Sequence, residues 1–136
     1  YRWVLEKKPH IIIIEIIDNV DTDQRRGFTE QNGKIPGKDK YAQVKDFKKK
    51  KKYKFGKMEY SLDSVGIRDI NQGHICALLT LNKKDYMFDG ENKVNIYRKD
   101  WKKLINRNED FKITPNIPEK YNFTKCYQCL VYYRSK

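Results

Sequence analysis

Apolar residues gather in short segments along this chain, and the longest apolar segment is Ile11 to Ile17, broken by Glu15. β-Branched residues occupy neighbouring positions in this run, so a strand here would present apolar side chains on both faces. We therefore expect a central strand that is buried on two sides. The segment 18–40 follows with little periodicity and several turn-forming residues, which predicts a long loop insertion.

A series of shorter strand patterns fills the second half of the chain. Apolar and polar residues alternate there with period two, or form short apolar runs, and turn-forming residues separate the runs. These patterns predict an antiparallel meander, and the last strand suits a buried interior position. The expected strands cover residues 53–55, 58–67, 74–80, 85–88, 94–97 and 126–133.

One short helix and one irregular segment complete the predicted architecture. Trp101, Leu104 and Ile105 recur at helical spacing, and Asp100 precedes them as a candidate N-cap. The segment 108–120 carries two prolines and predicts a surface excursion. The length of 136 residues predicts a single domain, and the elements place it in the α+β class with mainly antiparallel strands.

The charge balance favours acidic partners. The chain carries 30 Lys and Arg against 18 Asp and Glu, a formal net charge of +12. A lysine run leads into a strand with aromatic residues, which could hold a nucleic-acid backbone and stack bases. The alternative is a solvated sheet edge whose lysines block edge-to-edge pairing. No apolar stretch has the length of a membrane span, so no membrane contact is expected. The candidate residues of this basic and aromatic binding surface are Lys48, Lys49, Lys50, Lys51, Lys52, Tyr53 and Lys54.

Three cysteines, Cys76, Cys126 and Cys129, leave no even number for a disulfide framework, which favours an intracellular protein of the cytoplasm or nucleus. Cys126 and Cys129 have the CxxC spacing of a zinc site, but structural zinc needs two further ligands. On a strand, two residues three apart also face opposite sides. We therefore expect packed thiols, with no metal and no cofactor.

Three short sequences occur in an order that carries a chemical interpretation. They are Tyr-Ser-Leu-Asp-Ser-Val at 60–65, Gly-His-Ile-Cys-Ala at 73–77 and Tyr-Met-Phe-Asp at 86–89. A final aromatic and apolar strand follows at 127–133, and a Pro-x-Ile strand precedes them at 9–17. Together these segments resemble the C-terminal block of the ubiquitin-specific protease family. The Gly-His and Phe-Asp pairs are the specific parts of this resemblance.

The resemblance implies the C-terminal sheet subdomain of a papain-like cysteine peptidase. Such an enzyme needs an imidazole to hold the thiol as thiolate, and a carboxylate or amide to orient that imidazole. His74 would be the base and Asp89 the orienting acid. Gly73, Phe88 and Gly90 would line a cleft for the tail of ubiquitin or a ubiquitin-like protein. Gly73 would let backbone pass close to the substrate.

Two departures separate the chain from a complete enzyme of this type. The family's nucleophile lies upstream of the histidine, and no cysteine occurs between Tyr1 and Gly73. Because the chain begins at Tyr1 rather than at methionine, we expect a piece of a longer precursor. Gly90 stands where the family often has a second acid. One alternative is an inactive module that binds a ubiquitin-like or acidic partner. Another is a protease with Cys126 or Cys129 as nucleophile, although the surroundings that template requires are absent.

The hairpin between the histidine and the acid provides a geometric test. If Asn82 to Asp85 forms the turn, Asp89 pairs with Leu78, roughly 13 Å from His74 along the strand. If Leu81 and Asn82 form the turn, His74 and Asp89 lie directly opposite each other. A bulge could also correct the register. In the simplest alternative, the histidine begins a strand, the acid belongs to a turn, and neither has a catalytic role.

Overall fold

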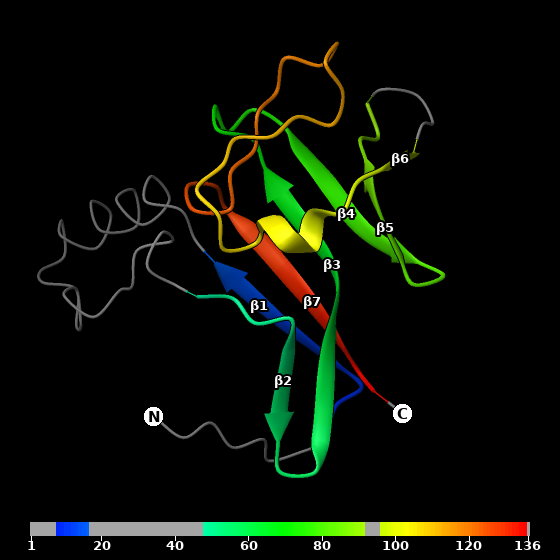
Figure 1. Ribbon diagram of the computed structural model, residues 1–136. Helices are drawn as coiled ribbons and strands as arrows, with labels where there is room; N and C mark the ends of the chain where they lie inside the picture. Colours follow the sequence, from blue (N-terminus) through cyan, green and yellow to red (C-terminus); the bar gives the residue numbers. More distant parts are fainter. Residues whose placement is uncertain (1–7, 17–47, 92–95, 136) are drawn as a thin grey trace, which may run out of the picture.

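The computed structural model describes residues 8–16, 48–91 and 96–135, and within these ranges the chain forms one seven-stranded antiparallel sheet (Figure 1). The expectation of a mainly antiparallel β architecture is confirmed. The predicted loop insertion at 18–40 lies outside the described residues. The elements are β1 (Ile11–Ile16), β2 (Lys52–Phe55), β3 (Met58–Arg68), β4 (Ile75–Leu81), β5 (Lys84–Phe88), β6 (Ile96–Arg98), the 3-10 helix η3 (Trp101–Leu104) and β7 (Gln128–Arg134).

Strand β3 organises the sheet, whose order is β1-β7-β3-β4-β5-β6 with β2 paired to β3. One edge of β3 pairs with β7, and the other edge pairs first with β2 and then with β4. A register shift between Leu62 and Ser64 inserts one residue into β3. This bulge keeps Leu62 and Val65 on the same buried face although they are three residues apart.

One face of the sheet packs against η3 and the chain that leads from η3 to β7 (Figure 1). Trp101 is fully buried, and its Nε1–H donates a hydrogen bond to the Leu79 carbonyl at 3.0 Å, which fixes η3 on β4. The segment 108–120, expected as a surface excursion, contributes buried side chains to this core. They are Phe111, Ile113 and Ile117.

Strand β1 departs from the prediction of a central strand buried on two sides. It lies at the end of the sheet order, next to β7. Ile13 is 62% exposed, whereas Ile16 is buried. The two-sided apolar pattern therefore has another cause: the sheet face opposite the core is also apolar at β1, and no described residue covers it there. We call it the open face. The same face carries further exposed apolar side chains at Ile75 and Tyr133.

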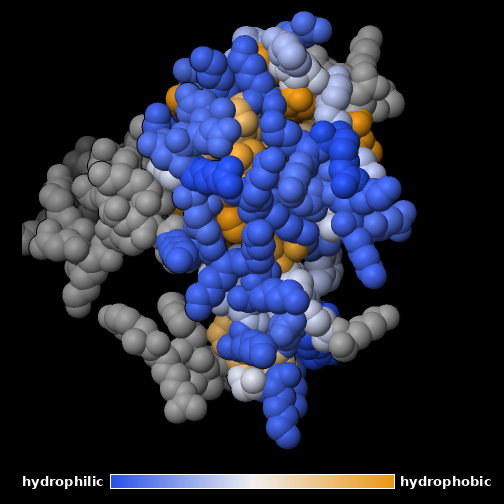
Figure 2. Space-filling model, viewed as in Figure 1, coloured by the Kyte–Doolittle hydropathy of each residue, from blue (hydrophilic) through white to orange (hydrophobic). Residues whose placement is uncertain are grey.

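The predicted helix is present as a single 3-10 turn. Asp100 occupies its N-cap position as expected, but its side chain makes no capping hydrogen bond. An ion pair of 3.2 Å between Lys102 and Asp85 ties the turn to β5 instead. Figure 2 shows that the face of the molecule with η3 in front is covered mainly by hydrophilic side chains. No helix of the described residues has the length and apolarity of a transmembrane span.

Candidate active site

The β4–β5 hairpin sets the positions of the histidine and the acid. Its turn is Asn82-Lys83, and both residues have positive φ angles of 51° and 64°. This conformation is typical of the two-residue turns whose twist matches a hairpin. Leu81 pairs with Lys84, and continuing this register places Asp89 level with Cys76 rather than with His74. Both registers considered from the sequence are therefore wrong, because Lys83 also adopts the left-handed conformation.

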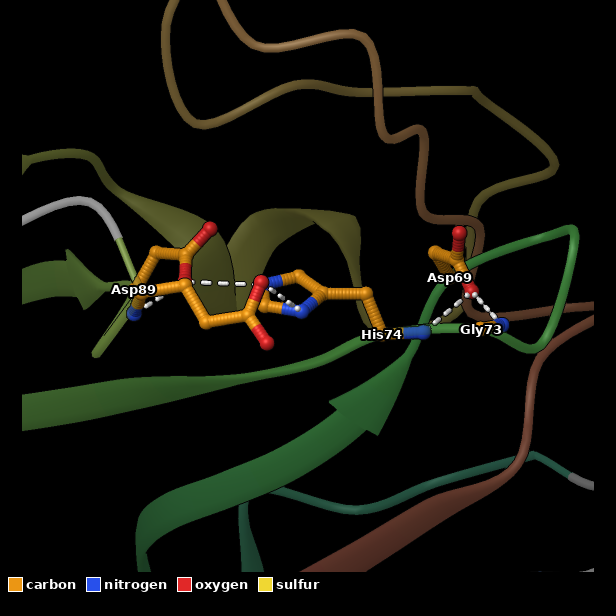
Figure 3. Close-up of polar contacts among 5 residues, drawn as sticks. Asp69, Gly73, His74 and Asp89 are labelled. Atoms are coloured by element: carbon orange, nitrogen blue, oxygen red, sulfur yellow. Dashed lines mark hydrogen bonds and ion pairs between the residues drawn. The ribbon is translucent and has the colours of Figure 1, made fainter.

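His74 and Asp89 nevertheless meet, because they are diagonal neighbours on the same face of the hairpin. The distance from His74 Nε2 to Asp89 Oδ1 is 2.7 Å. The Asp89 side chain is 1% exposed and the His74 side chain is 10% exposed. A carboxylate only accepts hydrogen bonds, so Nε2 carries the hydrogen and donates it. The expected contact between imidazole and carboxylate is present (Figure 3).

Asp69 fixes the backbone that carries the histidine. Asp69 directly follows β3, and its Oδ1 accepts hydrogen bonds from the backbone N–H groups of Gly73 at 2.8 Å and His74 at 3.1 Å. The Asp69 N–H also donates to the His74 carbonyl at 2.7 Å. Figure 3 shows His74 between Asp89 on one side and Asp69 with Gly73 on the other. The turn from β3 to β4 is thereby closed by a buried side chain, which restricts where the imidazole can lie.

Glu91 lies level with His74 across the hairpin and contacts the other ring nitrogen. Its Oε2 is 3.2 Å from His74 Nδ1, and its side chain is 80% exposed. The backbone N–H of Glu91 donates to Asp89 Oδ1 at 3.0 Å. Each nitrogen of the imidazole thus has a carboxylate within reach, one buried and one exposed.

These carboxylates decide the protonation of the imidazole. Burial disfavours the charged form of His74, but the hydrogen bond and the charge of Asp89 outweigh it, with further contributions from Glu91 and Glu119. The net result is a pKa of His74 raised above its usual 6.5. The region around the imidazole is therefore acidic within a chain of net charge +12.

The three residues predicted to line a cleft lie in different surroundings. Gly73 is exposed, and an added Cβ would meet nothing within 4 Å. Gly90 is exposed too, and its added Cβ would touch Phe88 at 3.7 Å. Neither glycine has a positive φ, so neither is required by its own backbone conformation. Phe88 pairs with Ala77 and alternates with the buried Met87, which places it on the open face of the sheet, away from His74.

The described cysteines are poor nucleophile candidates. Cys76 is buried two residues after the histidine, and burial raises the pKa of its thiol to about 12. A hydrogen bond with the hydroxyl of Tyr121 offsets part of this increase in the pKa of Cys76. Cys126 is buried in the core, and burial raises the pKa of Cys129. All three are free thiols, and the described residues contain no group of side chains suited to hold a metal ion.

The lysine run does not form one continuous binding face. Lys49 is 2% exposed, and its ammonium donates to the Phe123 carbonyl at 2.8 Å. Burial lowers the pKa of Lys49 to about 8. The Tyr53 ring packs against Tyr132 at a centroid distance of 5.1 Å, so it is not free to stack on a base. The exposed members are Lys48, Lys50, Lys51, Lys52 and Lys54.

Two residues of the site, Asp69 and Glu91, were not predicted from the sequence. The sequence does contain an indication for Asp69, because an Asp in a turn after a strand often accepts hydrogen bonds from nearby backbone N–H groups. No sequence pattern indicates Glu91, because its position beside His74 depends on the hairpin register.

Comparison with protein-family models, with curated proteins and with solved structures finds no match to this chain. The interpretation of the site therefore rests on the motif order and on this geometry.

Proposed function

We propose that this chain supplies the histidine and the orienting aspartate of a thiol-dependent hydrolase of the ubiquitin-specific protease type. The observation that carries the proposal is the 2.7 Å contact between His74 Nε2 and the buried Asp89 Oδ1. The contact joins the two specific motifs of the resemblance, and an added Cβ on Gly73, the residue before the histidine, would meet no atom within 4 Å. A papain-like arrangement of the whole enzyme is part of the same proposal.

The geometry assigns a role to each ring nitrogen. Asp89 accepts the hydrogen of Nε2 and so fixes the tautomer in which Nδ1 is the basic atom. Nδ1 would take the proton of a cysteine thiol, and the resulting imidazolium would later protonate the leaving amine. Asp89 favours this imidazolium by its charge. Because the described thiols are buried or lack a lowered pKa, the nucleophile would come from another part of the protein.

The test uses the complete gene product and ubiquitin with a thiol-reactive group at its C-terminus. The proposal predicts a covalent adduct on one cysteine, seen as a mass shift. His74→Gln should abolish the adduct, and His10→Gln is the matched control because His10 is the other histidine of the chain. If the complete protein reacts equally well without His74, or does not react although it contains a cysteine in a suitable upstream motif, the proposal fails.

A second candidate is a non-catalytic module that binds a ubiquitin-like or acidic partner. The observation in its favour is the open apolar face of the sheet, with Ile13 at 62% and Ile75 at 54% exposed, in a chain of net charge +12. This candidate predicts that ubiquitin binds and that Ile13→Lys weakens the binding, whereas His74→Gln does not. Titration of ubiquitin by calorimetry separates the two candidates.

A further inference from the structure

Glu91 occupies the one ring nitrogen of His74 that the dyad needs for proton transfer. Its Oε2 lies 3.2 Å from Nδ1, while Asp89 Oδ1 holds Nε2 at 2.7 Å. A carboxylate accepts but does not donate hydrogen bonds, so both nitrogens must carry hydrogen to satisfy both contacts. In this arrangement the imidazole is fully protonated and cannot accept a proton from a thiol.

The two carboxylates differ in how firmly they are held. Asp89 is 1% exposed and accepts a second hydrogen bond from the Glu91 backbone at 3.0 Å. The Glu91 side chain is 80% exposed, so its backbone is fixed while its carboxylate can turn into solvent. An exposed ion pair shifts an equilibrium by no more than about fivefold. Asp89 is therefore a permanent part of the site, and the Glu91 contact is readily opened.

We propose that Glu91 is a displaceable latch, whose carboxylate blocks His74 Nδ1 in the resting site and leaves when an anionic group takes its place. The identity of that group rests on the proposed function: it is the thiolate of the nucleophilic cysteine. When Glu91 turns away, the proton on Nδ1 passes to water, and the free nitrogen then takes the proton of the thiol, so that the thiolate pairs with the imidazolium. One negative charge replaces another, so the net charge around the imidazolium does not change.

The surroundings favour an exchange of anions over simple opening of the contact. The charged groups that influence the imidazole are Asp89 beyond β5, Glu91 opposite, and Glu119 from the chain that covers the sheet. Asp69 holds the backbone of the histidine, and the nearby buried thiol of Cys76 interacts with Tyr121. The charged groups that act most strongly on the histidine are all negative. Once Glu91 leaves, Asp89 remains in contact with Nε2, and Nδ1 is free to pair with the thiolate.

The first experiment measures how fast diethyl pyrocarbonate modifies each histidine of the protein, since this reagent attacks an unprotonated ring nitrogen. Glu91→Gln and Glu91→Ala should raise the rate at His74 about two- to fivefold at pH 6.5, because they remove the contact on Nδ1. Glu119→Gln, which removes a charge without a direct contact, should have a smaller effect. His10 in the same digest is the internal reference. Equal rates at His74 in the wild-type protein and in both Glu91 variants would overturn the proposal.

A second measurement does not depend on reagent access. Nitrogen-15 spectra of the imidazole should show that Glu91→Gln moves the titration of His74 to lower pH and shifts the Nδ1 resonance. The effect of the substitution should shrink in 0.5 M NaCl, because salt screens an exposed pair. An unchanged His74 titration would also overturn the latch. If both measurements show the expected effects of Glu91→Gln but the ubiquitin probe does not react, the contact of Glu91 with Nδ1 is supported and the thiol-hydrolase function is contradicted. If the probe reacts but the Glu91 substitutions have no effect on His74, only the latch is contradicted.

Discussion

His74 and Asp89 meet diagonally across the β4–β5 hairpin, with 2.7 Å between Nε2 and Oδ1, although neither residue belongs to the hydrogen-bonded ladder. The histidine precedes β4 and the acid follows β5, so the contact forms where the hairpin opens. Asp69 holds the backbone of the histidine from the side of β3. The position of the imidazole therefore depends on two turns, and each can be tested separately.

The contact with Asp89 should be the main reason that the histidine holds its proton. We expect Asp89→Asn to lower the pKa of His74 by about one unit or more, because an opposite charge in direct contact shifts a pKa by this amount. Titration of the imidazole resonances by NMR measures it, with His10 as the reference. Asp63→Asn, at the bulge of β3, is the matched control and should leave the titration of His74 in place. A pKa that stays the same without Asp89 would contradict the assignment of the contact.

The raised pKa of His74 makes folding stability depend on pH in a defined direction. Because the folded protein binds this proton more tightly than the unfolded chain, the contribution of His74 is fully present below about pH 6.5, the usual pKa of the group. It is lost as the pH rises through the folded-state pKa. The difference in unfolding free energy between wild type and His74→Gln should therefore shrink from pH 5.5 to pH 8.5 in urea titrations. A difference that grows over this range would show that burial outweighs the carboxylates.

The turn closed by Asp69 should contribute to both stability and site geometry. Asp69→Ala leaves the N–H groups of Gly73 and His74 without their acceptor, which should cost about 1–3 kcal/mol of unfolding free energy. Asp69→Asn keeps one side-chain oxygen and should cost less. Urea unfolding measures the loss, and the His74 resonances report whether the imidazole moves. A loss below about 0.5 kcal/mol for the alanine variant, the range of ordinary surface substitutions, would contradict this role.

The buried Lys49 provides a test that is independent of the site. Its pKa is lowered from 10.5 to about 8 by burial, so between these pH values the unfolded chain binds a proton that the folded protein has released. Stability should therefore rise with pH over this interval, by an amount on the order of 3 kcal/mol relative to Lys49→Met. Lys50→Met is the matched control at an exposed position. Parallel pH profiles for wild type and Lys49→Met would show that the ammonium is not buried.

Much of the sheet follows from the sequence, because its strands alternate apolar and polar residues between turn-forming residues. β3 and β5 were predicted nearly to their ends, and β7 within two residues. β1 was misplaced because an apolar strand at a sheet edge and one in the centre share the same pattern. Segment 108–120 was expected at the surface because of its prolines. Most of its residues are exposed or half-buried, but the spaced Phe111, Ile113 and Ile117 are buried in the core.

The site was predictable only in part, for physical reasons. The types and order of His74 and Asp89 point to a dyad, but their distance depends on the conformation of Lys83, a residue that seldom adopts positive φ. The same hairpin register places Glu91 beside His74, and no sequence motif around Glu91 predicts this position. Lys49 looks like its neighbours in the lysine run, and only the packing against Phe123 shows that it is buried.

The most direct test of the central claim is the rate at which the complete gene product cleaves a fluorogenic amide at the C-terminus of ubiquitin. We predict cleavage by the wild-type protein and no change for His10→Gln. His74→Gln should lower kcat/KM by about 100-fold or more, since general-base catalysis contributes roughly 10²–10⁴-fold. Cleavage that persists at the wild-type rate without His74 would contradict the assignment of this histidine as the catalytic base.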